Sequence, residues 1–311
     1  MKLNYALWRC LQVVPTLVLI GLVVFFLTRA LPGDTISAML GDRASDETIA
    51  RLSRQTGLDQ PVLAQFATFV RALAHGELGT SIAFHVPVTR LIAERLPATL
   101  MLTGLATLLA LVLAVPLAFV SAICANRWPD LVIRSLFQVG LSSPIFYVGL
   151  ILLTLFAAWL KLFPVGGYGE GLADNLYHLF LPALTLALSF SAVIMRNLRA
   201  SILQVLQAEF VEFATAKGLE PHIIMRRHVL RNAAIAAVTL IGLQVGQLLG
   251  GAVITETVFA VPGVGRLMVE SIFARDYPVI QMLTLVLAVL VSAAFLLTDL
   301  LQMWLDPRIS R

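Results

Sequence analysis

Six stretches of this chain are apolar and long enough to cross a lipid bilayer, and this feature constrains the fold more than any other. A transmembrane helix needs about 20 mostly apolar residues. The stretches cover residues 10–30, 98–124, 136–160, 179–196, 235–257 and 279–303. In lipid, a helix satisfies its own backbone hydrogen bonds, whereas an isolated extended segment does not. The sequence therefore predicts an all-α integral membrane protein with six transmembrane helices.

The composition favours a membrane protein and argues against nucleic-acid binding. Apolar residues make up 59% of the chain and charged residues only 13%, against roughly 25% charged in soluble proteins. The net charge is +4, but the basic residues are scattered among the apolar stretches. Orientation by the positive-inside rule explains them, so we expect contact with membrane lipid and no nucleic-acid partner.

The positions of lysine and arginine predict that both termini face the cytoplasm. Six crossings place the termini on one side, and the loops on that side carry most of the basic residues. The prediction divides the chain into a tail and first helix (1–30), an external helical segment (31–97), a five-helix core (98–303) with a cytoplasmic loop at 197–234, and a tail (304–311). In the external segment we expect two amphipathic helices, one beginning near Ser45 and one capped by Asp59. They could cover the bundle, receive a soluble partner, or do both.

Small residues recur every four positions in two of the predicted spans. Helices in lipid associate through close backbone contact, which small residues allow. We therefore expect these positions either to pack the bundle or to form a subunit interface. They are Ala106, Ala110 and Ala114 in the second span, and Gly242, Gly246 and Gly250 in the fifth.

No predicted span carries a charged residue at its middle, and Asp299 near the end of the sixth span comes closest. Ion-coupled carriers usually need ionisable groups along their path. The sequence therefore disfavours a self-contained secondary transporter or channel. Ser142, Ser143 and Pro144 in the third span are candidates for a kink that exposes backbone to a pore, and a simple packing kink is an equal alternative.

The most strongly charged segment is Glu209–Asn232, between the fourth and fifth spans. We expect the fourth helix to continue past the membrane with an apolar stripe that ends at Phe210 and Phe213. Gly218 then ends this helix, and Pro221 begins a second one that reaches about Arg231. Such a loop suits a groove on a soluble partner, although a solvated positive loop is an alternative. The candidate docking residues are Glu209, Glu212, Ala214, Lys217, Gly218, Pro221, Arg226, Arg227 and Arg231.

This loop resembles a known motif. Glu212, Phe213, Ala214, three residues and Gly218 are similar to the Glu-Ala-Ala-x-x-x-Gly loop of ABC importer permeases, with Phe213 in place of the first alanine. The flanking sequences resemble the dipeptide/oligopeptide permease family almost from end to end. They are LPGDT (31–35), GELGTS (76–81), RLPATL (95–100), RHVLRNA (227–233), GLQVGQLLGGAVITETVFAVPGVGRL (242–267), RDYPVIQ (275–281) and LDPRI (305–309).

The resemblance implies a type I ABC importer permease fold in the bacterial inner membrane, and half of a heterodimeric pore. It also implies several partners: a second homologous permease, two cytoplasmic ATPase subunits that hold ATP and Mg²⁺, and a periplasmic or lipid-anchored binding protein. The implied cargo is a di- or oligopeptide; nickel chelates, glutathione, opines and sugar derivatives are alternatives in the same family. A non-transporting membrane scaffold is a third class of function, which the resemblance disfavours.

We expect no catalytic residue, cofactor or metal in this chain itself. None of its lysines, Lys2, Lys161 and Lys217, follows a glycine, so the sequence contains no G-x-x-x-x-G-K-[ST] phosphate-binding loop. Its histidines show no metal-ligand spacing.

Overall fold

The computed structural model describes residues 2–30, 47, 51, 54, 57 and 59–305, and for 2–10, 30, 221, 226–228, 231, 234–237, 239, 251, 304 and 305 the backbone only. Within this part the regular structure is helical, apart from one isolated bridge between Thr80 and Pro87. The predicted helix near Ser45 and the end of the tail lie outside the described residues.

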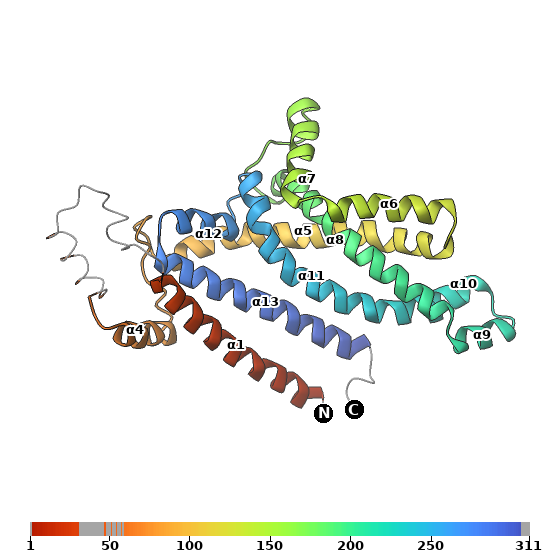
Figure 1. Cartoon of the computed structure of the whole chain (residues 1–311), viewed down its shortest axis with the longest axis horizontal. Helices are drawn as coiled ribbons and strands as arrows, with labels where there is room; N and C mark the ends of the chain where they lie inside the picture. The colour runs from red at the N-terminus through yellow and green to blue at the C-terminus, as the bar shows by residue number, and fades with distance from the viewer. Residues whose placement is uncertain are drawn as a thin grey trace.

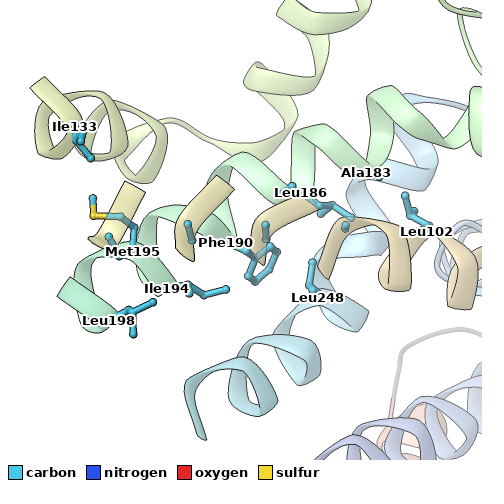
Figure 2. Close-up of a cluster of buried hydrophobic side chains, with 14 of the residues drawn as sticks. Leu102, Ile133, Ala183, Leu186, Phe190, Ile194, Met195, Leu198 and Leu248 are labelled. Atoms are coloured by element: carbon cyan, nitrogen blue, oxygen red, sulfur yellow. The ribbon is translucent and has the colours of Figure 1, made fainter. Parts of the chain in front are cut away.

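Two long helices, α5 (Val88–Ile123) and α8 (Leu172–Leu206), form the centre of the bundle. The alanines predicted from the ladder in α5 lie on its inner face: Ala106, Ala110 and Ala114 are all buried. Their small side chains let the two backbones approach. Leu186 and Phe190 from α8, together with Leu102 from α5, fill the space around them (Figure 2).

Two further helices flank this pair, α11 (Leu230–Val258) and α13 (Tyr277–Leu305), and they pack against each other. Gly242 and Gly246 of α11 lie at this contact, against Thr298 and Phe295 of α13. At Gly250 no neighbouring atom of the described chain lies within 4 Å of a would-be Cβ. For Gly250, a role at a subunit interface therefore stays a prediction.

The contact at Gly242 leads to a testable prediction. A Cβ at this position would lie 2.5 Å from the Thr298 Cβ, so Gly242→Ala forces α11 and α13 apart. Overpacking of this kind costs about 1–3 kcal/mol. We expect a lower Tm for the purified Gly242→Ala protein and no decrease for Gly104→Ala, where the added Cβ meets no atom within 4 Å and alanine has the higher helix propensity. Equal effects of the two substitutions would contradict this packing.

The predicted third span is not one straight helix. The structure has α6 (Trp128–Ser142), then α7 (Ile145–Leu152) continued by a π-helix, η2 (Leu153–Trp159), with a bend of 105° between them. Ser143 takes an extended conformation before Pro144, because the proline ring disfavours helical geometry in the preceding residue. The kink expected at Ser142, Ser143 and Pro144 is therefore present, whereas a continuous span over 136–160 is wrong.

The first helix, α1 (Lys2–Ala30), packs on α13, and Gln281 of α13 donates a hydrogen bond of 2.7 Å to Thr28. In Figure 1 the first residues of α1 and the last residues of α13 lie at the same end of this pair. Four helices have the length and apolarity of a bilayer span, α1, α5, α8 and α13, and the bent pair α6–α7 counts as a fifth only if its two halves form one broken span. In α11 the apolar stretch found among the described residues is shorter, Leu240–Gly250. A sixth crossing and cytoplasmic termini stay predictions.

Cysteine labelling tests this topology. Asp59 and Glu220 are both exposed. Asp59 shortly precedes α4 and Glu220 directly precedes α10, and these two helices lie toward opposite ends of the molecule (Figure 1). We expect a membrane-impermeant thiol reagent to label Asp59→Cys from outside right-side-out vesicles, and Glu220→Cys only after the vesicles are opened. The reverse pattern would overturn the predicted orientation.

Helices α4 (Val62–Ala74) and α12 (Val264–Phe273) lie away from the charged segment Glu209–Asn232, toward the other end of the bundle (Figure 1). The helix expected after Asp59 is thus present, with Pro61 rather than Asp59 at its cap position, and its external location stays a prediction. Its Phe66 packs edge-on against Phe25 of α1, with ring centroids 5.1 Å apart. This contact fixes α4 to the bundle.

A buried carboxylate holds the corner between α11 and α12. Glu256 accepts hydrogen bonds from the Thr99 hydroxyl and from the backbone N–H of Arg266, in the first turn of α12. It takes the place of an N-cap side chain, since the cap residue is Gly263 and a Cβ there would lie 2.2 Å from the Glu256 carboxylate. The corner between α11 and α12 is therefore a capped turn with defined geometry.

Candidate functional site: a docking loop at one end of the bundle

The segment between α8 and α11 forms a loop of short helices that protrudes from one end of the bundle (Figure 1). It contains α9 (Glu209–Ala216), then α10 (Pro221–Ile223) and the π-helix η3 (Ile224–Val229), which runs directly into α11. The backbone carbonyl of Glu220 accepts the N–H groups of Ile223 and Ile224 and so starts this second helix. No described residue from 221 to 258 has a positive φ. The second helix is therefore continuous with α11, and the separate short helix expected to end near Arg231 is wrong.

A break at Gln207 and Ala208 separates α8 from α9 and changes which residues are exposed. Ala208 is extended, with ψ at 142°, so the helical register does not carry over. The apolar stripe predicted to run from α8 to Phe213 is wrong for this reason. Phe210 and Phe213 are 43% and 68% exposed.

The buried face of α9 consists of Val211 and Ala214, which belong to the main core cluster together with Ile224 and Val229 of η3. Ala214, predicted as a docking residue, is thus buried. It supports the outer surface of α9 from beneath and is not part of that surface.

Gly218 ends α9 in the way the sequence predicts. Its φ is +76°, a left-handed conformation that glycine adopts without steric cost. The N–H of Leu219 bonds to the carbonyl of Ala214 at 3.2 Å, and the N–H of Gly218 bonds to that of Thr215 at 2.9 Å. These two bonds form a Schellman motif. The turn therefore has one defined geometry.

The outer surface of α9, which we call the docking surface, comprises Glu209, Phe210, Glu212, Phe213 and Lys217, all exposed. It combines two aromatic rings with two carboxylates and one ammonium group. The other predicted docking residues lie next to it in the chain: Pro221 begins α10, Arg226 and Arg227 lie in η3, and Arg231 is in the first turn of α11. Their side chains are outside the described part of the structure.

A buried ion pair lies at this end of the bundle, and the sequence alone does not indicate it. Asp130 of α6 is fully buried, and Arg199 of α8 donates two hydrogen bonds to its carboxylate at 2.8 and 2.7 Å. The Ser121 hydroxyl of α5 and the backbone N–H of Asn126 complete the site. Arg134 approaches the same carboxylate at 3.2 Å. The ion pair therefore joins α5, α6 and α8 next to the point where α8 leads into α9.

Both residues of this pair are visible in the sequence, but nothing in their local sequence indicates that they pair. Asp130 and Arg199 are 69 residues apart, and in the sequence each looks like an ordinary loop charge. A buried charge is stable only when it is paired and hydrogen-bonded.

Among the described residues, no group of three or more His, Cys, Asp or Glu side chains is placed to hold a metal ion.

Comparison with known proteins identifies the family. The profile of the binding-protein-dependent transport system inner membrane component matches residues 114–311, and the profile of its N-terminal part matches residues 2–103. The chain belongs to this family. As an inner membrane component of such a system, it is a permease subunit of an ABC transporter and a multi-pass membrane protein.

Several relatives of this permease match it over nearly its whole length. It is 38% identical to the probable D,D-dipeptide transport system permease protein DdpB of Escherichia coli (strain K12), over 97% of this chain and 96% of the relative. It is also 38% identical to the glutathione transport system permease protein GsiC of Salmonella choleraesuis (strain SC-B67), over 99% of both chains.

Two solved structures share the fold of this permease. One is an amino acid ABC transporter with histidines, with a TM-score of 0.55 and 19% identity over 69% of this chain and 94% of that one. The other is the inward-facing MetNI methionine ABC transporter, with a TM-score of 0.59 and 15% identity over 70% and 96%. The predicted ABC importer permease fold is thus confirmed.

Proposed function

We propose that this permease forms one half of the pore of an ATP-driven importer for di- or oligopeptides or a peptide-like solute, in the bacterial inner membrane. The names of the relatives support a peptide-like cargo, since one is a dipeptide permease and another a glutathione permease. A second, homologous permease completes the pore. Glutathione, a nickel chelate, an opine or a sugar derivative remain alternative cargoes in this proposal.

The docking surface is the observation that carries the proposal. Two exposed phenylalanines at the tip of a polar loop would be costly in water and are typical of a surface that a partner covers. In our proposal α9 fits a cleft on one of two cytoplasmic ATPase subunits. These subunits hold ATP and Mg²⁺, and this chain binds no cofactor. A periplasmic or lipid-anchored binding protein delivers the solute at the opposite end.

The coupling we propose is mechanical. When the ATPases close around ATP, the two docking loops move together. The Schellman turn at Gly218 keeps α9 at a fixed angle, and η3 passes the displacement directly into α11. Arg199 and Asp130 tie α8 to α5 and α6, so these helices move as one body. Hydrolysis then resets the pore to the inward-facing state.

An ion-coupled carrier is the competing class, and the surroundings of the buried carboxylates disfavour it. Asp130 is paired with Arg199, and Glu256 caps a helix through a hydroxyl and backbone N–H groups. Both lie near helix ends and are held by fixed donors. A group that exchanges ions during transport needs access to its cargo.

Reconstitution tests the proposed function. The chain, a second permease, ATPases and a binding protein encoded beside it would be placed in proteoliposomes, and uptake of labelled di- and tripeptides measured. We expect uptake to require both ATP and the binding protein. Uptake driven by an ion gradient without ATP would contradict the proposal.

A further inference from the structure

Helix α6 separates two grooves, and of the two only the second is lined by charged side chains. On one side, a cavity of about 460 Å³ at the bend with α7 is walled almost wholly by apolar side chains, among them Leu136, Val139 and Leu117. On the other side, a cavity of about 610 Å³ lies between α6 and α8. Its wall includes Arg134, Ser135 and Gln138 of α6 and Arg196 and Arg199 of α8. Apolar side chains such as Leu131, Leu141 and Met195 also line the second groove, so what distinguishes it from the first is its three arginines.

Polar side chains follow one face of α6, and the stripe begins in this second groove with Arg134 and Gln138. Arg134, Gln138 and Ser142 are four residues apart and all exposed, so they lie above one another on the helix. The Gln138 amide donates a hydrogen bond of 3.3 Å to the Ser142 hydroxyl. Ser142 ends α6, about 20 Å along the axis from Trp128 at 1.5 Å per residue. With Trp128 at the membrane surface and α6 along the bilayer normal, the stripe would reach deep into a hydrocarbon core of about 30 Å.

An exposed polar stripe at this depth requires water, solute or protein beside it. Arginine can extend its guanidinium to the interface, so Arg134 and Arg196 alone would be compatible with a lipid-facing surface. Gln138 and Ser142 are too short to do so. Polar side chains in spans usually face the bundle interior or a water-filled cavity.

The charge of the groove indicates which solutes it favours. Three arginines line it, and the one carboxylate beside them is Asp130, which pairs with Arg199 and Arg134. This leaves a surplus of two positive charges. Arg196 is exposed at the rim, one turn from Arg199, and guanidinium groups bind carboxylates with two-pronged hydrogen bonds.

We propose that the groove between α6 and α8 is part of the aqueous solute path and favours anionic groups, such as the terminal carboxylate of a peptide. Arg196 is its selecting residue, and Gln138 continues its polar wall, with Ser142 one turn beyond on the same face of α6. This inference rests on the proposed function, since it assumes that the permease conducts a solute. An anionic lipid headgroup has related chemistry, but the depth of Gln138 and Ser142 favours the solute path.

Thiol labelling of the assembled transporter in nanodiscs tests the groove without any knowledge of the substrate. With Cys10 and Cys124 replaced by alanine, Gln138→Cys and Leu136→Cys would be reacted with an anionic and a cationic methanethiosulfonate of similar size. Leu136 is 67% exposed on the other side of α6. We expect Gln138→Cys to react at least about tenfold faster than Leu136→Cys, because thiolates form and react in water and not in lipid. Equal rates would overturn the aqueous path.

The charge is tested in the same assay. Gln138→Cys should prefer the anionic reagent, and Arg196→Gln should reduce this preference by roughly threefold, since one unit charge at the groove is removed. Arg127→Gln, which removes an exposed arginine outside the groove, is the matched control and should change nothing. An unchanged preference in Arg196→Gln would overturn the selecting role.

Lipid composition separates the two ligand sources. The labelling would be repeated in discs of phosphatidylcholine alone and of phosphatidylcholine with phosphatidylglycerol. The solute path predicts equal rates in both, whereas slower labelling with phosphatidylglycerol would show a headgroup site and contradict the proposal. Because this assay requires no uptake, loss of ATP-driven transport in the reconstituted system would refute the proposed function independently.

Discussion

Gly218→Pro is expected to abolish ATP-driven uptake while the protein still assembles in the membrane. Proline fixes φ near −65°, whereas Gly218 has a φ of +76°. Proline also removes the N–H that bonds to the carbonyl of Thr215 at 2.9 Å. Both bonds of the Schellman turn then fail, and α9 no longer presents Phe213 and Glu212 at a fixed angle. Because the turn lies outside the helical core, we expect the spans to fold.

A second substitution at the same position makes this test specific. A Cβ at Gly218 meets no atom within 4 Å, so backbone conformation is the obstacle and not space. Asparagine tolerates the left-handed conformation better than other residues. Gly218→Asn should therefore keep most of the uptake and of the transport-linked ATP hydrolysis. Uptake that survives Gly218→Pro would remove the docking role of the loop.

Asp130→Asn is expected to destabilise the permease by about 3 kcal/mol, near the lower end of the cost of breaking a buried ion pair. The substitution leaves the Arg199 guanidinium, whose side chain is only 16% exposed, without its charged partner. Water can reach the site beside Arg134, whose side chain is 47% exposed, and its hydration lowers part of this cost. The Tm of the purified complex, with and without Asp130→Asn, measures the loss.

An exposed ion pair on the same chain serves as the control. Arg90 and Glu94 are joined at 2.8 Å, but their side chains are 69% and 56% exposed. Glu94→Gln should not change the Tm, because exposed pairs contribute little. If Asp130→Asn were equally silent, the ion pair would not tie the helices together as the coupling account requires.

The features that the sequence predicted correctly are those decided locally. Apolar length defines α1, α5, α8 and α13, and Pro144 defines the kink after α6. The turn at Gly218 and the helix start at Pro221 are also predictable, because each depends on one residue with a special backbone preference. In each case the physical cause lies within a few positions of its effect.

The features that were missed depend on geometry over longer range. One extended residue, Ala208, rotates α9 so that Phe213 faces outward, and no periodicity in the sequence shows this. Arg199, which pairs with Asp130, lies 69 residues away from it, and Thr99, which bonds to Glu256, lies 157 residues away. Which charges become buried is decided by how the helices pack, and only the packed structure reveals it.

Photo-crosslinking from Phe213 tests the central claim most directly. A photoreactive amino acid would replace Phe213 at the docking surface or Phe273, which is 85% exposed at the C-terminal end of α12. Helix α12 lies away from the docking surface (Figure 1). In the complete transporter, we predict that the Phe213 variant forms an adduct with an ATPase subunit and the Phe273 variant does not. An ATPase adduct from position 273, or none from position 213 in an assembled complex, would contradict the account.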